Sequence, residues 1–157
     1  MNQDRIHPRY NFVNVLLIFN AEEEYIVSTS NYGSNGMSSS SQTSFNYDDI
    51  VSAKLNSDGD LDWARNINKR QSTTDDSSYI SYTSTIKDND TYFFINASEK
   101  AKKISANRIE FGDTRKNKYH LNIIRINQKG DFDYQKIIDD EKKEDHFMVS
   151  KDTLINR

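Results

Sequence analysis

Polar side chains surround Gly59 in a pattern that could hold a metal ion or shape a tight turn. Oxygen-bearing side chains stand at alternate positions, Asn56, Asp58, Asp60 and Asp62. Calcium takes about six to eight oxygen ligands, and an EF-hand loop needs glycine at its sixth position and glutamate at its twelfth. Here glycine is fourth and Ile67 is twelfth. Alternate residues on the two arms of a hairpin also do not converge on one point. The pattern therefore favours an Asx-stabilised β-turn, and we expect no tight calcium site there.

The other residue types that carry chemistry are absent or scattered. The chain has no cysteine, which excludes disulfides, thiolate metal sites and cysteine nucleophiles. Its histidines, His7, His120 and His146, show neither metal-ligand spacing nor a triad-like neighbour. Carboxylates are abundant, but a glycosidase would need two at a set separation across a cleft, and no pair stands out. We therefore predict no catalytic, cofactor-binding or metal-binding residue, no cofactor and no enzymatic activity.

Two further groups of residues admit both a binding role and a structural role. The most basic stretch contains Lys100, Lys102, Lys103, Arg108, Arg115, Lys116 and Lys118. It could meet an acidic polysaccharide or nucleic acid, but it lacks an aromatic platform for bases, which favours a solvated loop. The aromatic residues singled out are Trp63, Tyr79, Tyr82, Tyr92, Phe93 and Phe94. They could line a sugar site, although aromatics on strands more often fill the space between packed sheets.

Length and charge limit the classes of partner. The chain has 157 residues, the length of a single domain. A net charge of −3 supplies no overall field to attract nucleic acid or an anionic membrane. The apolar run at residues 12–19 is interrupted by Asn14, is too short to span a bilayer and lacks a cleavage-site pattern. The expected partner is thus an unknown protein or glycan ligand, with no nucleic acid and no membrane insertion.

The elements that must position these residues occur twice. Residues 47–67 and 118–138 align without a gap when Gly59 is set on Gly130. The matched pairs include Ile50/Leu121, Lys54/Arg125, Leu55/Ile126, Asn56/Asn127, Asp60/Asp131, Leu61/Phe132 and Trp63/Tyr134. Such a repeat indicates one supersecondary unit that stacks on copies of itself.

Hydrophobic alternation and turn signals predict four antiparallel strands in each unit. The first unit should hold strands at residues 11–19, 24–30, 48–56 and 61–68. The second should hold strands at residues 79–86, 91–97, 119–127 and 131–138. Polar loops are expected at residues 31–46 and 69–78, a charged turn at residues 20–23 and a basic connection at residues 98–117.

The repeat also makes predictions about side chains. Val51, Ala53 and Leu55 should share one strand face, and Leu61, Trp63 and Ile67 should share another. The matched positions Leu55, Leu61, Ile126 and Phe132 should be largely buried. Trp63 and Tyr134 should occupy equivalent places in the two units.

Residues 49–65 resemble the repeat of bacterial secreted β-propeller proteins. In that family a strand ending in a Lys-Leu-Asp-type triplet meets a glycine turn, and the next strand ends in Trp-Ala-Lys or similar. Here Lys54-Leu55-Asn56 and Trp63-Ala64-Arg65 match those triplets. The match is weaker at residues 120–136, where Tyr134-Gln135-Lys136 replaces the second triplet. The resemblance implies repeated blades, an extracellular or cell-surface location and a binding role, and it implies no catalytic residues.

The expected fold is all-β, with antiparallel four-stranded blade-like repeats that make a partial β-propeller; the alternative is a β-sandwich. One domain, residues 1–157, would hold units at about 11–68 and 79–138 and a partial unit at 145–157. A closed propeller takes at least about four blades, so open blade faces should favour self-association. The expected function is a non-enzymatic scaffold or binding module. The alternatives are a small oligomeric lectin-like propeller and a fragment of a propeller hydrolase.

Overall fold

The computed structural model describes residues 4–13, 16–32, 39–74, 80–98, 101–112 and 120–137. Within these ranges the chain forms strands, turns and bends, so the expected all-β class is confirmed. None of the described segments is a helix long and apolar enough to cross a bilayer. The partial unit expected at residues 145–157 lies outside the described residues.

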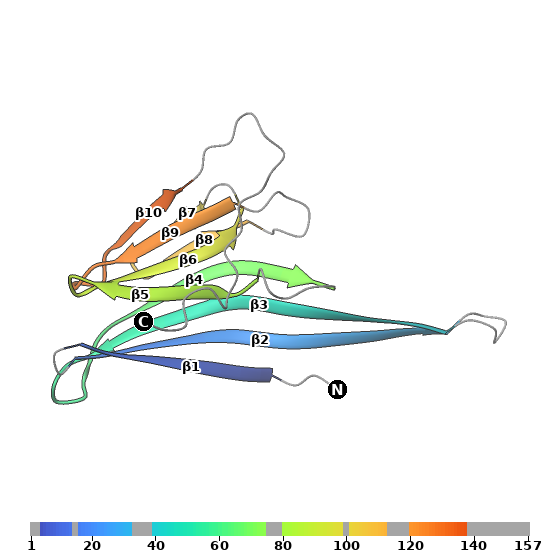
Figure 1. Cartoon of the computed structure of the whole chain (residues 1–157), viewed down its shortest axis with the longest axis horizontal. Helices are drawn as coiled ribbons and strands as arrows, with labels where there is room; N and C mark the ends of the chain where they lie inside the picture. The colour runs from blue at the N-terminus through green and yellow to red at the C-terminus, as the bar shows by residue number, and fades with distance from the viewer. Residues whose placement is uncertain are drawn as a thin grey trace.

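The first four strands are successive antiparallel neighbours and form what we call the first unit (Figure 1). They are β1 (Asp4–Val13), β2 (Leu16–Tyr32), β3 (Ser39–Leu55) and β4 (Leu61–Thr73). A short hairpin extends this sheet beyond β4. Its strand β8 (Arg108–Phe111) runs parallel to β4, and β7 (Ala101–Ile104) is antiparallel to β8. The sheet order is therefore β1-β2-β3-β4-β8-β7.

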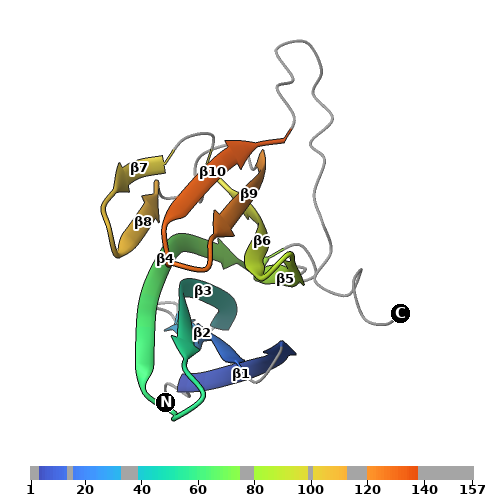
Figure 2. The ribbon, with the colours of Figure 1, turned by 90° about the vertical axis from the view of Figure 1, so that its left-hand side faces the viewer.

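The second sheet is a four-stranded antiparallel meander that we call the second unit. Its strands are β5 (Tyr82–Lys87), β6 (Asp90–Ala97), β9 (His120–Ile126) and β10 (Phe132–Lys136). They lie in the order β10-β9-β6-β5. The two open sheets face each other as two layers, and the β7–β8 hairpin, inserted between β6 and β9, joins the sheet of the first unit (Figure 2).

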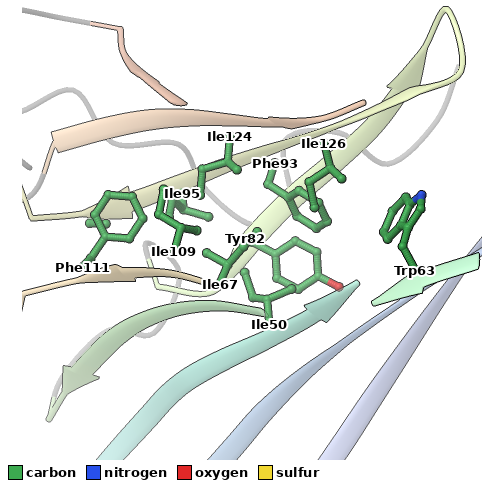
Figure 3. Packing of buried hydrophobic residues seen from close by; sticks show 11 residues of the cluster. Ile50, Trp63, Ile67, Tyr82, Phe93, Ile95, Ile109, Phe111, Ile124 and Ile126 are labelled. Atoms are coloured by element: carbon green, nitrogen blue, oxygen red, sulfur yellow. The ribbon is translucent and has the colours of Figure 1, made fainter. Parts of the chain in front are cut away.

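The hydrophobic core fills the space between the two sheets (Figure 3). The first sheet contributes Ile50, Trp63, Ile67, Ile109 and Phe111. The second contributes Tyr82, Phe93, Ile95, Ala97, Ile124 and Ile126. The rings of Tyr82 and Phe93 pack with their centroids 5.6 Å apart. The structural interpretation of Trp63, Tyr82 and Phe93 as residues between packed sheets is therefore confirmed.

The predicted position of the first hairpin was wrong. β2 continues through residues 20–23, where the charged sequence indicated a turn. β1 pairs with β2 from Asp4↔Tyr25 to Val13↔Leu16, so the chain reverses earlier than expected. The acidic residues misled the prediction because one of them, Glu22, is buried in an ion pair rather than solvated at a turn.

Three segments expected to be loops are strands in part. β3 begins at Ser39 and pairs with β2, and the hydroxyls of Ser28 and Thr43 lie 3.2 Å apart across the two strands. β4 continues to Thr73. The basic connection at residues 98–117 contains the β7–β8 hairpin. A polar segment gains a fixed extended conformation when a neighbouring strand supplies partners for its backbone groups.

The two glycine-centred turns have the same hydrogen bonds, so the repeated hairpin is confirmed. In each turn the leading asparagine donates its N–H to the carbonyl of the aspartate four residues later, at 2.9 Å from Asn56 and 3.1 Å from Asn127. The Oδ1 atom of each asparagine accepts two backbone N–H groups, all at 2.9 Å. Gly59 and Gly130 have φ angles of 88° and 85°, which glycine adopts without steric cost.

Val51, Ala53 and Leu55 share one face of β3, as predicted, and it is the other face of the strand that meets the second unit. Ile50 is in the core cluster, and Lys54 Nζ donates to the carbonyl of Gln128 in the second unit at 3.2 Å. Because successive residues of a strand point to opposite faces, Val51, Ala53 and Leu55 point away from the second unit. Val51 is accordingly 40% exposed.

The matched strand β9 uses its other face. Ile124 and Ile126 belong to the core cluster, whereas Leu121, Ile123 and Arg125 point away from the first unit by strand alternation. Leu121 and Arg125 are the matches of Ile50 and Lys54, which point inward in the first unit. Equivalent faces of the two units therefore point in the same direction. The units are therefore stacked head to tail: the two open sheets form two layers around one core, as in a sandwich, but equivalent faces do not meet, and the described residues form no closed propeller.

This stacking and a bulge at Asp62 explain why some side-chain predictions were wrong. Ile126 is buried and Phe132 packs on the core, but their matches differ: Leu55 is half-buried and Leu61 is 61% exposed. Leu55 and Leu61 point away from the second unit, so the second sheet does not cover them. The sequence alignment predicted their burial because it does not show which face of each unit meets the other.

The same bulge separates Trp63 from Leu61 and from Tyr134. Pairing passes from Leu55↔Leu61 to Lys54↔Trp63, which turns Trp63 inward to share a face with Ile67. β10 has no bulge there, so Arg125 pairs with Asp133 and Tyr134 pairs with Ile124. Trp63 and Tyr134 are consequently not equivalent in space.

Candidate functional site

Two adjacent strand pairs of the first sheet, β2–β3 and β3–β4, lose their regular register at the same level. Pairing of β2 with β3 passes from Glu22↔Ile50 to Glu24↔Tyr47. Pairing of β3 with β4 is interrupted between Tyr47 and Asp49. Such bulges re-aim side chains and are frequent next to functional sites. We call residues 22–24, 47–49 and 68–71 the bulge zone.

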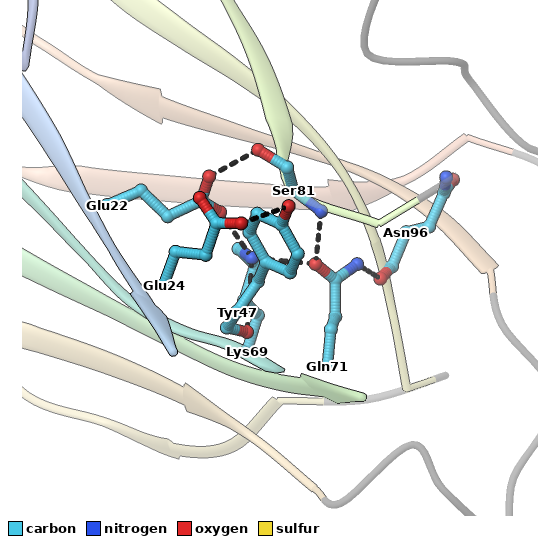
Figure 4. A network of polar contacts seen from close by, with 7 residues as sticks. All are labelled: Glu22, Glu24, Tyr47, Lys69, Gln71, Ser81 and Asn96. Atoms are coloured by element: carbon cyan, nitrogen blue, oxygen red, sulfur yellow. Dashed lines mark hydrogen bonds and ion pairs between the residues drawn. The ribbon is translucent and has the colours of Figure 1, made fainter. Parts of the chain in front are cut away.

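One side of the bulge zone carries a buried ion pair (Figure 4). Lys69 Nζ lies 2.5 Å from a carboxylate oxygen of Glu22, and the two side chains are 0% and 6% exposed. The same ammonium group donates to the carbonyl of Tyr47 at 3.2 Å and to Oε1 of Gln71 at 2.6 Å. Lys69 thus has the partners that a buried charge requires.

Neighbouring polar groups tie this ion pair to the second unit (Figure 4). Gln71 Oε1 accepts the backbone N–H of Ser81 at 2.7 Å, and its Nε2 donates to the carbonyl of Asn96 in β6. The Ser81 hydroxyl donates to Glu22. Ser81 has a φ angle of 85°, a strained value for a residue with a Cβ. The network therefore holds the start of β5 in a conformation that serine does not favour by itself.

Tyr47, on β3, also belongs to this network. Its hydroxyl donates to Glu24 at 2.9 Å, and its ring centroid lies 5.4 Å from Lys69 Nζ, within cation–π range. Backbone and ring of Tyr47 therefore both contact the buried ammonium group.

Burial lowers the pKa of Lys69 from its usual 10.5, and the carboxylate of Glu22 opposes this shift without cancelling it. A lysine with a lowered pKa near a serine hydroxyl is chemically able to act as a base. Ion-pair networks that hold a fold together shift pKa values in the same way. Lys69 is 0% exposed and Ser81 is buried, so a substrate has no access to them, and the arrangement acts as a clamp between the sheets.

The lowered pKa predicts a pH dependence of stability. Between the folded-state pKa and 10.5 the unfolded chain binds more protons at Lys69 than the folded chain, so stability rises with pH through this window. We expect the difference in unfolding free energy between the wild type and Lys69→Met to grow as pH is raised from neutral toward 10. Urea unfolding of both proteins at each pH measures it. A difference that shrinks with pH would indicate a raised pKa instead.

The bulge zone also borders a polar pocket of about 310 Å³. Its lining residues are Glu23, Tyr25, Asn46, Asp48, Asp49, Asn68, Arg70, Gln71 and Ser72. Among these are three carboxylates and one guanidinium group, so the lining is acidic. Sequence reasoning did not single out any of these residues, because a bulge that gathers them has no local sequence signature.

Hydrogen bonds fix the walls of this pocket. Asp48 accepts from the Tyr25 hydroxyl at 3.1 Å. Asp49 accepts from the side-chain amides of Asn66, at 3.0 Å, and Asn68. Arg70 Nε donates to Asn68 Oδ1 at 3.2 Å. Carboxylates, amides and a tyrosine held in this way can hydrogen-bond a ligand that carries several hydroxyl groups, at little cost for ordering the site.

The structure places the residues that the sequence singled out as follows. Asn56 uses its side-chain oxygen to form the turn. Among the described residues no three His, Asp or Glu side chains are placed to hold a metal ion. His120 begins β9, and His7 lies in β1; His146 lies outside the described residues.

The basic and aromatic groups are dispersed. Lys102 and Lys103 are exposed on β7, and Arg108 is 3.8 Å from Asp49. Tyr92 and Phe94 are half-buried on the face of the second unit that points away from the first. The other residues of these groups, Tyr79, Lys100, Arg115, Lys116 and Lys118, lie outside the described residues.

No family model, no curated protein and no solved structure matches this chain.

Proposed function

We propose that the chain is a non-enzymatic scaffold or binding module built from blade-like units of the β-propeller type. The observation that carries the proposal is the head-to-tail stacking of its two units. Each blade of a propeller is a four-stranded antiparallel sheet, and each repeat in a stack contacts its neighbours through opposite faces. The first and second units have this strand order and this relation.

The contact between the two units supports this interpretation. The Trp63 indole N–H donates to the Gln128 carbonyl at 3.1 Å, and the Arg65 guanidinium donates to the Gly130 carbonyl. The tryptophan of one unit thus rests on the glycine turn of the next. Trp63 belongs to the triplet that resembles the propeller repeats, and it also joins the two units.

The proposed location is the cell surface or the exterior of a bacterium. The support is the resemblance of residues 49–65 to the repeats of secreted propeller proteins. The proposed role is to present a rigid surface to a protein or glycan ligand.

A lectin-like function is a second candidate, and the pocket of the bulge zone favours it. Its carboxylates and amides are suited to the hydroxyl groups of a sugar, and Tyr25 lines the same pocket. The excess of carboxylates over the single Arg70 disfavours an acidic sugar by charge repulsion. A neutral or amino sugar is the ligand class that fits.

A glycan array tests this candidate. We expect the wild type to retain neutral or amino sugars and Asp48→Asn to lose most of that binding, because Asp48 lines the pocket. The control Asp58→Asn makes the same chemical change on the exposed Gly59 turn and should bind as the wild type does. Equal binding by both variants would show that this pocket does not bind the sugar. Release of a cleaved sugar, detected by mass spectrometry, would contradict a non-enzymatic role.

A further inference from the structure

We propose that the face of the first unit that points away from the second unit is a docking site for the second unit of another copy of this chain. The inference rests on the blade-like stacking proposed above. It extends that stacking from the contact inside one chain to a contact between chains.

The docking face consists of residues that pair across three strands. The rows are Leu17, Leu55 and Leu61; Phe19, Ala53 and Ala64; and Ala21 and Val51. We call these residues the outer apolar face. Leu61 and Val51 are 61% and 40% exposed, and both are among the exposed large hydrophobic residues of the described chain. Ala64 is also exposed, Leu17, Phe19, Ala53 and Leu55 are half-buried, and Ala21 is buried. Apolar side chains that remain exposed on one sheet face are typical of an interaction site.

The same positions in the second unit are buried against the first unit. Phe19 pairs with Ala53 as Phe93 pairs with Ile124, so Phe93 and Ile124 are the equivalents of these two residues. Both are 0% exposed. Phe132, the match of Leu61, packs on the core. The contact inside the chain therefore shows what covers this face: the side of a unit that carries Ile50, Lys54 and Trp63 in the first unit.

The second unit has an equivalent side, and it points away from the first unit. Its residues are Tyr92, Phe94, Leu121, Ile123 and Arg125; Leu121 is 5% exposed, and the other four are half-buried. Leu121 and Ile123 are the matches of Ile50 and Ser52, and Asp133, which pairs with Arg125, stands where the first unit has Trp63. Arg125 is the match of Lys54 and keeps its positive charge.

The two glycine turns also differ in whether another unit covers them: the Gly130 turn is covered by the first unit, and the Gly59 turn is open. A Cβ added at Gly130 would lie 2.8 Å from Cγ of Trp63, whereas one added at Gly59 meets nothing within 4 Å in the part of the chain that the structure describes. Lys54 donates to the carbonyl of Gln128, whose match is Ser57. In a stack of two copies, Arg125 of one copy would donate to the Ser57 carbonyl of the next.

Head-to-tail contacts generate a closed ring or an open filament, depending on the rotation between copies. Sedimentation velocity over a series of concentrations tests the contact. We expect species larger than the 18.3 kDa chain whose fraction rises with concentration. Leu61→Lys should lose them, because it places a charge on the outer apolar face. Ile104→Lys is the matched control, since Ile104 is 57% exposed on β7, away from this face, and should sediment as the wild type does.

Cross-linking identifies the partner face, since the chain lacks cysteine. We expect a short bismaleimide to join Ser57→Cys to Asp133→Cys when the two variants are mixed, and neither variant to itself. A Ser57→Cys homodimer would overturn the head-to-tail contact in favour of a two-fold one. A wild type that stays monomeric at every concentration would overturn the docking as a whole. If that monomer still buries Trp63, shown by its fluorescence, the stacking inside the chain stands without the contact between chains.

Discussion

Lys69→Met should lower the free energy of unfolding by about 3–5 kcal/mol, because it leaves the Glu22 carboxylate buried without a counter-charge. Glu22 has 6% of its side chain exposed, so water cannot replace the missing ammonium group. Urea denaturation followed by tryptophan fluorescence measures the loss.

Two further variants separate the buried ion pair from other effects of the substitution. Lys102→Met removes a lysine that is 67% exposed and lies 3.9 Å from Glu110, and should cost about 1 kcal/mol or less. The double variant Glu22→Leu/Lys69→Met removes both buried charges and should recover much of the loss. Strictly additive losses in the double variant would show that Glu22 and Lys69 do not interact.

Gly130→Ala should cost about 2–5 kcal/mol, the sum of left-handed strain and overpacking. Its φ angle is 85°, and the added Cβ would lie 2.5 Å from Arg65 Nη2 and 2.8 Å from Trp63 Cγ. The guanidinium group can move, but the tryptophan ring is fixed in the contact between the units. Thermal or urea unfolding measures the effect.

Gly59→Ala is the matched control for this prediction. The turn has the same hydrogen bonds and a φ angle of 88°, but the added Cβ has open space. The expected loss is about 1–2 kcal/mol, from backbone strain alone. Equal losses in the two variants would mean that Trp63 does not rest on the Gly130 turn.

Local turn chemistry made the repeated hairpin predictable. Asn56 and Gly59 act on backbone groups within a few residues, and their effect is the same in both units. Strand faces were harder to assign. β3 carries apolar side chains on both faces, Ile50 on one and Val51 and Leu55 on the other. Polarity then cannot decide which face meets the second unit.

The bulge zone could not be predicted, because it depends on contacts between distant parts of the chain. Glu22 and Lys69 are residue types that are almost never buried without a partner, and their partners come from different strands. Charged residues at 20–23 indicate a turn by local rules. Lys69 points inward with Ile67 by strand alternation, and the register breaks of β3 with β2 and with β4 gather Asp48 and Asp49 at the pocket.

Methyl NOE spectroscopy of isoleucine-labelled protein tests the head-to-tail stacking of the two units most directly. We expect NOEs from Ile124 and Ile126, in β9, to Ile50 and Ile67 in the first unit, because all four belong to one core cluster. Ile123 should show no NOE to either of the latter two, since it points away from the first unit. NOEs from Ile123 to Ile50 or Ile67, without those from Ile124 and Ile126, would contradict the account and establish a two-fold sandwich.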